Sequence, residues 1–499
     1  MRRLLRGVAP VRAALLVAVG AGLILGATYL PSPVNLARGT SSAAATRAQA
    51  DPVTLTRSIC PGPETLGVEG LRGSPAQTVS VAAVGAPVAA LPPGTVAGRG
   101  GGSLTLSGLP PGGRSAVAQS AVRGEVISGP VSTARSVLVT GNGAMAPGTT
   151  ATQWSWTRSG DTRGLATAPC LPATASSWLV AGGAAPGRLE HLVLVNPGPN
   201  PVTVDLSVLG VKGPIESPDA RGLVVAGHAR TVILLDAIAG SEPSPAVHVT
   251  VRGGTVAATL SDTWLDGLVP RGGDDVGPEA SPALEQVIAS VPVDGRAILR
   301  VGVPGDTEAV VQTRVLTPRG PRALPANGVT RVAAGSTADI SLSSLPPGSY
   351  AVQVRADVPV VAAAMVDRRR AAGAPSDLAW SSSSPPIRTM AGLALPAAEV
   401  GGLAQRLDLV ATGAPGSVRV TTVDAARRVR TNKVAIAADS VSTMSLTGAT
   451  SAWVTPLAGL VRAAVLTSVT DVGGTLLSVT PLADLILTAT PLPLRDLRD

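Results

Sequence analysis

The feature that most constrains this 499-residue chain is a pattern that recurs about every 107 residues. Residues 192–198 (LVLVNPG) match residues 299–305 (LRVGVPG) at an offset of 107, and residues 225–234 match residues 333–342 at an offset of 108. Weaker copies occur toward the two ends of the chain, at residues 438–446 and 104–112. Recurrence at a fixed interval indicates similar structural units in series.

Short runs within these units alternate between apolar and polar residues. Residues 202–208, 247–251 and 351–355 alternate with a period of two, which predicts strands with one buried face. Turns rich in Pro and Gly, such as residues 196–200, separate the runs and favour antiparallel pairing. A unit of about 105–110 residues with some seven short strands has the size of an immunoglobulin-like sandwich. We therefore predict an all-β chain of tandem immunoglobulin-like β-sandwich modules.

The composition agrees with this prediction. The chain has no Phe, two Tyr and six Trp, so its core must be built from Val, Leu, Ile and Ala, which suit strands. With 45% hydrophobic and only 14% charged residues, it is also unlike a disordered chain.

The N-terminal segment predicts a single membrane span. Residues 1–12 hold four Arg and no acid, and residues 13–30 are apolar and uncharged. As a helix this run spans about 27 Å, enough for a bilayer core, with the N-terminus in the cytoplasm. The only convincing small-x-small cleavage site, Ala48-Gln49-Ala50, lies about 20 residues further on. This distance favours an uncleaved signal-anchor, although a cleaved signal peptide stays open; both export the rest of the chain.

Two stretches rich in Gly, Pro and Ser, residues 266–282 and 370–386, are predicted to be connectors between modules. The expected organisation is a cytoplasmic tail (1–12), a transmembrane signal-anchor (13–30), a flexible tether (31–52), an N-terminal β module (53–177) and three β-sandwich modules (178–285, 286–391 and 392–499). Asp274, Asp275 and Glu279 lie in the first connector, where we expect solvated linker charges; a calcium ion stiffening the joint is the alternative.

The charge argues against a nucleic-acid partner. The net charge is +8, and four of the positive charges belong to residues 1–12, which leaves the exported part with about +4. Two Arg-rich groups, residues 368–370 and Arg427 with Arg428 and Arg430, are predicted to be solvated loop charges. Contact with an anionic envelope polymer is the alternative.

Catalytic motifs are missing from the sequence. It contains no Gly-x-Ser-x-Gly, Ser-x-x-Lys, His-Glu-x-x-His or Cys-x-x-Cys motif and no phosphate-binding Gly-Lys-Ser/Thr loop. His191, His228 and His248 lack the spacing of metal ligands and are predicted to be unrelated surface or edge residues. We predict no catalytic residue, no metal and no cofactor.

The cysteines and two tryptophans are the candidate site residues. Cys60 and Cys170 enclose the N-terminal module and lie outside the membrane, so we predict a disulfide between them, with two buried thiols as the alternative. Trp154 and Trp156 share one face of a predicted strand. Core packing is the first interpretation for both, and stacking on a sugar ring is the second.

Several of these segments together resemble a known family. The run WLVAGG at residues 178–183, the Asn-Pro-Gly strand ending, the CPGP start at residues 60–63 and the pair Pro169-Cys170 are similar to an actinobacterial, membrane-anchored, exported family catalogued only as a domain of unknown function. The resemblance covers most of residues 50–499. It implies an envelope location and brings no established catalytic residues.

We therefore expect a non-enzymatic, single-pass membrane protein whose bulk lies outside the cytoplasm. Its expected role is that of a cell-envelope scaffold or accessory interaction subunit. Cell-wall glycan binding through Trp154 and Trp156 is the alternative, and a hydrolase with an unfamiliar site is a third possibility. The expected partners are the membrane, through residues 13–30, and either an envelope protein or a wall glycan; the oligomeric state stays open.

Overall fold

The computed structural model describes only part of the chain, all of it within the unit Asp51–Asp499. The described residues are 51–63, 79–93, 95, 100–112, 118–131, 135–324, 328–369, 373–396 and 402–489. The predicted tail, transmembrane segment and nearly all of the tether lie outside them and stay predictions. No helix among the described residues is both long and apolar enough to cross a membrane.

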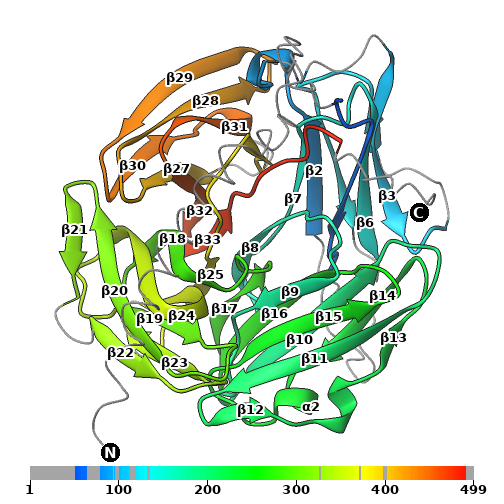
Figure 1. Ribbon diagram of the computed structural model, residues 1–499. Coiled ribbons are helices and arrows are strands. Elements are labelled where there is room, and N and C mark those ends of the chain that lie inside the picture. Colours follow the sequence, from blue (N-terminus) through cyan, green and yellow to red (C-terminus); the bar gives the residue numbers. More distant parts are fainter. Residues whose placement is uncertain are drawn as a thin grey trace, which may run out of the picture. The chain divides into compact units, whose positions relative to one another are not determined.

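The all-β prediction is confirmed for the described residues (Figure 1). Their helical pieces are short: α2 (Asp236–Ala239) and two single turns, η1 (Val88–Ala90) and η2 (Pro218–Ala220). All strand pairings between named strands are antiparallel, as Pro/Gly turns between short alternating runs favour. The immunoglobulin-like character of the modules stays a prediction.

The first eight strands form two four-stranded sheets, in the orders β1-β6-β3-β4 and β5-β2-β7-β8. Their bounds are β1 (Leu55–Cys60), β2 (Val79–Gly85), β3 (Gly102–Leu109), β4 (Ala118–Ser120), β5 (Val126–Val131), β6 (Ser136–Gly143), β7 (Thr149–Thr157) and β8 (Gly164–Pro169). Apolar residues of both sheets, such as Val81 and Leu106, share one core. We call β1–β8 the first module.

The second module comprises β9–β17, with sheet orders β14-β10-β16-β17 and β12-β11-β15-β9, and β13 paired to β11. The bounds are β9 (Ser176–Leu179), β10 (Arg188–Asn196), β11 (Val202–Gly210), β12 (Gly213–Ile215), β13 (Leu223–Val225), β14 (Ala229–Leu234), β15 (Ala246–Arg252), β16 (Ala257–Asp266) and β17 (Val269–Val276). Leu192 and Val204 represent the two sheets in its core.

The third module comprises β18–β25: β18 (Ala283–Val293), β19 (Arg296–Gly302), β20 (Ala309–Thr317), β21 (Gly320–Ala323), β22 (Val329–Val332), β23 (Thr337–Ser341), β24 (Gly348–Arg369) and β25 (Ser376–Ser382). The 22-residue β24 joins these strands in the order β21-β20-β24-β19-β23, with β18 and β25 also paired to β24 and β22 paired to β20. Its first part pairs with β18 and β20, and its last part pairs with β19 and β25.

The fourth module comprises β26–β33, in the orders β26-β31-β28-β29 and β30-β27-β32-β33. The bounds are β26 (Ala391–Ala394), β27 (Ala404–Ala411), β28 (Gly416–Asp424), β29 (Val429–Ile436), β30 (Ser440–Ser445), β31 (Ala449–Ala458), β32 (Val461–Asp471) and β33 (Gly474–Pro481). The alternating runs at residues 202–208, 247–251 and 351–355 lie in β11, β15 and β24, so these strand predictions are confirmed.

The last strand of each module joins it to the others. In every module this strand pairs with the strand before it: β8 with β7, β17 with β16, β25 with β24 and β33 with β32. The four last strands also contact one another in a closed circuit, β8 to β17 to β25 to β33 and back to β8. We call these four strands the hub (Figure 1).

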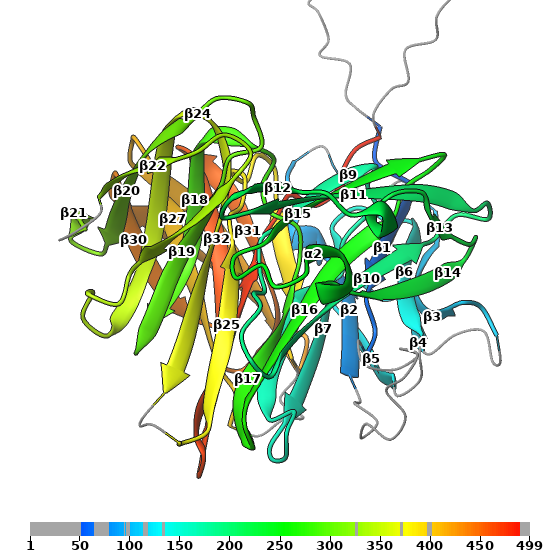
Figure 2. The ribbon, with the colours of Figure 1, turned by 90° about the horizontal axis from the view of Figure 1, so that it is seen from below.

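The beginning and the end of the described chain close this arrangement. The Val53 amide donates to the Leu487 carbonyl at 3.1 Å, and the Ala489 amide donates to the Asp51 carbonyl at 2.8 Å. In Figure 2 the first blue residues therefore lie beside the last red ones. These bonds tie the fourth module directly to the entry of the first.

Candidate functional site

The hub corrects the prediction that residues 266–282 and 370–386 are connectors between modules. They contain β17 and β25, whose residues are largely buried. Small residues are needed there because the strands approach closely. A Cβ atom on Gly272, which has a φ of +98°, would lie 2.1 Å from Oδ1 of Asp377. The Gly- and Ser-rich composition therefore serves close packing between modules.

One chain of hydrogen bonds through Asp274 joins all four modules. The Thr167 amide of the first module donates to Oγ of Ser478 in the fourth at 3.0 Å. The Ser478 hydroxyl donates to Oδ1 of Asp274 in the second module at 2.7 Å, and the Trp380 amide of the third donates to Oδ2 at 2.8 Å. Asp274 is 2% exposed, so the prediction of a solvated linker charge is wrong for this residue.

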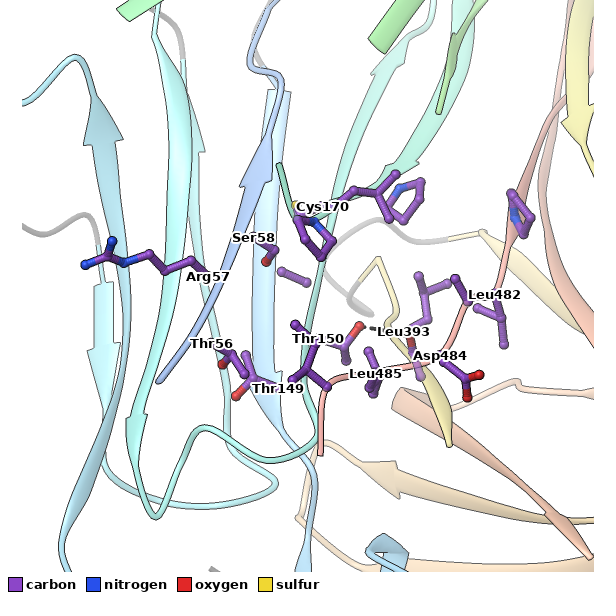
Figure 3. Close-up of a pocket in the computed structure, with 18 residues that line it drawn as sticks. Thr56, Arg57, Ser58, Thr149, Thr150, Cys170, Leu393, Leu482, Asp484 and Leu485 are labelled. Carbon is purple, nitrogen blue, oxygen red and sulfur yellow. Dashed lines mark hydrogen bonds between the residues drawn. The ribbon is translucent and has the colours of Figure 1, made fainter. Parts of the chain in front are cut away.

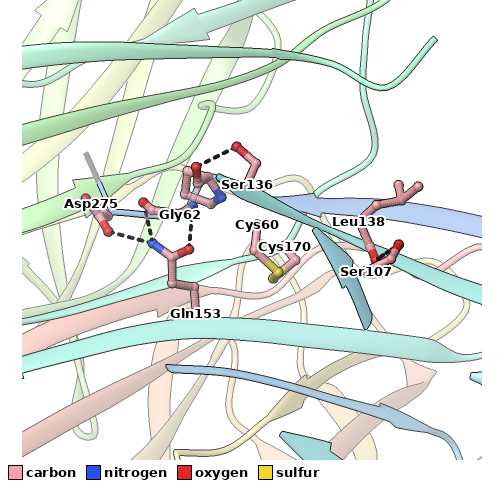
Figure 4. Close-up of a disulfide and its surroundings, with 9 residues drawn as sticks. Cys60, Gly62, Ser107, Ser136, Leu138, Gln153, Cys170 and Asp275 are labelled. Atoms are coloured by element: carbon pink, nitrogen blue, oxygen red, sulfur yellow. Dashed lines mark hydrogen bonds between the residues drawn. A yellow bond between two sulfur atoms is a disulfide. The ribbon is translucent and has the colours of Figure 1, made fainter. Parts of the chain in front are cut away.

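Asp275 is buried as well, and it connects the hub to the disulfide region (Figure 4). The Gln153 side-chain amide donates to Asp275 at 3.3 Å, while its carbonyl oxygen accepts the Gly62 amide at 2.7 Å. Gly62 follows Cys60, and Cys60 is bonded to Cys170 across 110 residues. The predicted disulfide is therefore confirmed. It links Cys60, the last residue of β1, to Cys170, the residue that follows β8.

Burial governs the acidity of the hub carboxyl groups. It raises the pKa of Asp274 and of Asp377 well above their usual range, although hydrogen bonds to both groups oppose the shift. Burial also raises the pKa of Asp275 to about 6. The charged form of these carboxyl groups is disfavoured because the surrounding modules exclude water from them. The hub acids therefore retain their protons to a higher pH than exposed acids do.

Buried arginines add ionic contacts within and between modules. Nε of Arg188 lies 2.8 Å from Oδ1 of Asp262, and the Trp380 indole donates to Oδ2 of the same carboxylate at 2.6 Å. Arg271 of the second module pairs with Asp367 of the third. Because both partners of each pair are shielded from water, removing one would leave an uncompensated buried charge.

The segments that leave the four hub strands line a cavity of about 350 Å³, which we call the junction pocket. It is bordered by residues 169, 171, 172, 277–282, 383–385 and 481–483, together with residues of β9 and the stretch before it. Six of the lining residues are prolines, and Glu279 is the one acidic or basic residue among them. A concave, mostly apolar pocket with a few polar groups is the usual form of a binding site.

Glu279 lines this pocket as a buried side chain, so the prediction that it is a solvated charge is wrong. It is 8% exposed, and its Oε2 accepts the Ser383 amide at 2.5 Å and the Ser383 hydroxyl at 3.0 Å. Burial raises its pKa well above the usual range. The described residues contain no group of three His, Cys, Asp or Glu side chains that could hold a metal ion, so nothing in them supports the calcium alternative.

A second, narrower cavity of about 90 Å³ lies between β1, β7 and the segment after β33 (Figure 3). The Thr150 hydroxyl donates to the Gly392 carbonyl at 2.8 Å on one wall. Thr56, Ser58 and Asp484 also line it. The residues that line it belong to the first and fourth modules, which contact each other here. The cavity is too small to leave much room for a ligand.

The two candidate glycan-binding tryptophans have different surroundings. Both lie on β7, but Trp154 is only 3% exposed and packs with Trp453 in an apolar cluster between the first and fourth modules. Its burial removes Trp154 from any exposed sugar platform. Trp156 is partly buried, and the Arg158 guanidinium lies 4.2 Å from its ring centroid.

The histidines do not come together. His191 is 1% exposed inside β10, so its prediction as a surface or edge residue is wrong. The register explains this, because β10 lies between β14 and β16 in its sheet. His248 is half-buried, stacks on Trp178 at 4.5 Å and bonds to Ser176 at 2.8 Å. His228 occupies a turn, with a φ of 52°.

Comparison with models of known protein families assigns the chain to a family. Residues 126–447 match a model described as a family of unknown function, DUF5719. The chain belongs to this family. The DUF5719 match runs from β5 to just past β30 and therefore includes three of the four hub strands. The actinobacterial origin that the sequence suggested stays a prediction.

Comparisons with curated proteins and with solved structures do not extend the family assignment. A search of the curated proteins found no match. A crystal structure described as a tetra-tandem repeat in the extending region of a large adhesion protein is 14% identical, with 81% of this chain and 91% of that chain covered. Its TM-score is 0.09, which is too low to support an argument about fold or function.

Proposed function

We propose that this DUF5719 protein is a non-enzymatic, membrane-anchored scaffold or accessory subunit of the cell envelope. The observation that carries the proposal is the hub, which joins four modules through the buried bonds of Asp274. A protein held together in this way presents fixed surfaces to partners. The predicted signal-anchor would keep those surfaces outside the cytoplasmic membrane.

The junction pocket is the proposed contact point for a partner. It is the place where segments of all four modules meet, and several of its lining residues, including Pro172, Ser176 and Ser281, are exposed. Preformed concave surfaces bind with little cost in ordering the protein. A partner seated there would contact every module at once.

In-cell crosslinking of the full chain tests this proposal. Ser281→Trp should block the pocket and remove crosslinks to a membrane or envelope protein. Val472→Trp is the matched control, because Val472 is fully exposed in the turn before β33, at the other end of that strand. Equal crosslinking by both variants would argue against the pocket, and turnover of an ester, glycoside or peptide substrate by the purified chain would argue against a non-enzymatic role.

Cell-wall glycan binding is the second candidate, now carried by Trp156 and Arg158 rather than by two tryptophans. The exposed Arg158 guanidinium, which stacks on the Trp156 ring at 4.2 Å, offers hydrogen-bond donors to the hydroxyl groups of a sugar. Trp156→Ala should then abolish cosedimentation of the chain with insoluble wall glycan. Unchanged cosedimentation of this variant would exclude the site.

A further inference from the structure

The edge strand β29 of the fourth module carries an unusual set of charges. It ends the sheet order β26-β31-β28-β29 and, among the described residues, pairs only with β28. Seven of its eight residues are exposed or half-exposed. Such an edge is open to contact along its whole length.

Two cations face each other across this edge. Arg419 of β28 and Lys433 of β29 are direct partners in the antiparallel register. Side chains directly opposite in an antiparallel pair lie on the same face with Cβ atoms about 5 Å apart, and like charges there are destabilising. Within the described part of the chain, Arg428 pairs with Asp424 at 2.8 Å, whereas Arg419, Arg430 and Lys433 have no carboxylate partner.

Arginines of β28 and β29 border two open grooves, one on each face of the sheet. Arg428, Arg430 and Asn432 line a groove of about 500 Å³ between β29 and β30. Arg419 lines another of about 610 Å³, together with Arg388 and Thr455. The repulsion between Arg419 and Lys433 thus lies beside space large enough for a ligand.

We propose that the β29 edge is a binding site for a linear polyanion that carries repeated phosphate groups. A phosphate placed between Arg419 and Lys433 would neutralise both cations and accept the forked donors of the arginine. Arg388, which lines the same groove as Arg419, would contact a further phosphate. The site does not depend on the scaffold role or on the junction pocket, and its local charge sets it apart from the modest net charge of the chain.

Fluorescent sodium polyphosphate of one fixed length is the probe, and the full chain in an uncharged detergent is the sample. The wild-type chain should bind it with an affinity that falls as salt rises. Lys433→Glu, which reverses one charge of the opposed pair, should weaken binding by about tenfold or more and lower the slope of log affinity against log salt by roughly 1.4, or about 0.7 per unit of charge. Lys212→Glu is the matched control, since Lys212 is the only other lysine and is exposed in the turn between β11 and β12.

The same variant has a second readout. Lys433→Glu places a carboxylate opposite Arg419, so it should unfold at the same or a higher temperature than the wild-type chain while binding less polyphosphate. Arg419→Gln should also weaken binding, and it serves as the second variant should Lys433→Glu fail to fold. Equal loss of affinity in the Lys433 and Lys212 variants would overturn the proposal. So would absence of wild-type binding, or binding only to phosphatidylcholine vesicles containing phosphatidylglycerol, which would assign the edge to a membrane surface.

Discussion

Replacing Ser478 by Ala is the sharpest perturbation of the hub. The Ser478 hydroxyl accepts the Thr167 amide at 3.0 Å and donates to Oδ1 of Asp274 at 2.7 Å. The substitution removes a single oxygen atom from a fully buried position of β33. It leaves the apolar cores of all four modules unchanged, so its effect reports on the contacts between them.

The expected cost follows from the groups left without partners. The Thr167 amide loses its acceptor, and Asp274 loses one of its donors, whereas the Thr167 hydroxyl keeps Thr480 at 2.7 Å. A buried polar group without a partner costs about 1–3 kcal/mol, so two such groups should lower the free energy of unfolding by about 2–6 kcal/mol. By comparison, removing a hydroxyl group from the protein surface usually changes the free energy of unfolding by less than about 0.5 kcal/mol.

Urea unfolding of the full chain in an uncharged detergent measures this cost. Ser136→Ala is the control, because Ser136 is equally buried but makes one bond, to the Pro61 carbonyl at 2.7 Å within the first module. Ser478→Ala should cost about twice as much as the control and should also speed proteolysis between modules. A cost below about 1 kcal/mol, or one no larger than that of Ser136→Ala, would refute the account of the hub.

Three further predictions follow from burial and close packing. Replacing both Cys60 and Cys170 by Ser opens a loop of 110 residues and should lower the free energy of unfolding by about 4–5 kcal/mol in urea titrations, whereas an unchanged midpoint would contradict a stabilising bridge. Burial raises the pKa of Glu190 to about 7, so its folded form holds a proton more tightly than its unfolded form does. Stability should therefore fall by up to roughly 1.4 kcal/mol per pH unit as the pH rises from about 4.3 to 7, and Glu190→Gln should flatten this slope. Gly272→Ala puts a Cβ atom 2.1 Å from a neighbouring oxygen and should cost over about 3 kcal/mol, against about 1 for Gly267→Ala, where φ is also positive but nothing lies within 4 Å; equal costs would remove the packing argument.

The strands could be predicted because their alternating pattern is local in the sequence. The disulfide could be predicted because the chain has only two cysteines. Residues 202–208 alternate with a period of two in the sequence and form β11 in the structure. Cys60 and Cys170 are the only cysteines of the chain, so only one pairing was available. These predictions need no knowledge of how the modules meet.

The hub could not be predicted from local pattern because its burial comes from other modules. The run Gly272–Val276 has no apolar alternation, and Gly and Asp ordinarily mark turns. It is buried because β8 and β25 pack against β17 and because Ser478 of β33 bonds to Asp274. One signal was available: Asp274 precedes Trp380 by 106 residues, so the two occupy equivalent places in the recurring pattern. The recurrence marks these segments as parts of each unit rather than as joints between units.

Hydrogen exchange of the full chain tests the hub most directly. If β8, β17, β25 and β33 join the modules, the amides of residues 269–276 and 376–382 should be among the slowest to exchange, at rates close to those of the core strand β10. Exchange of these two segments as fast as the exposed turn at residues 471–474 would show that they are solvated connectors, and it would contradict a closed four-module body.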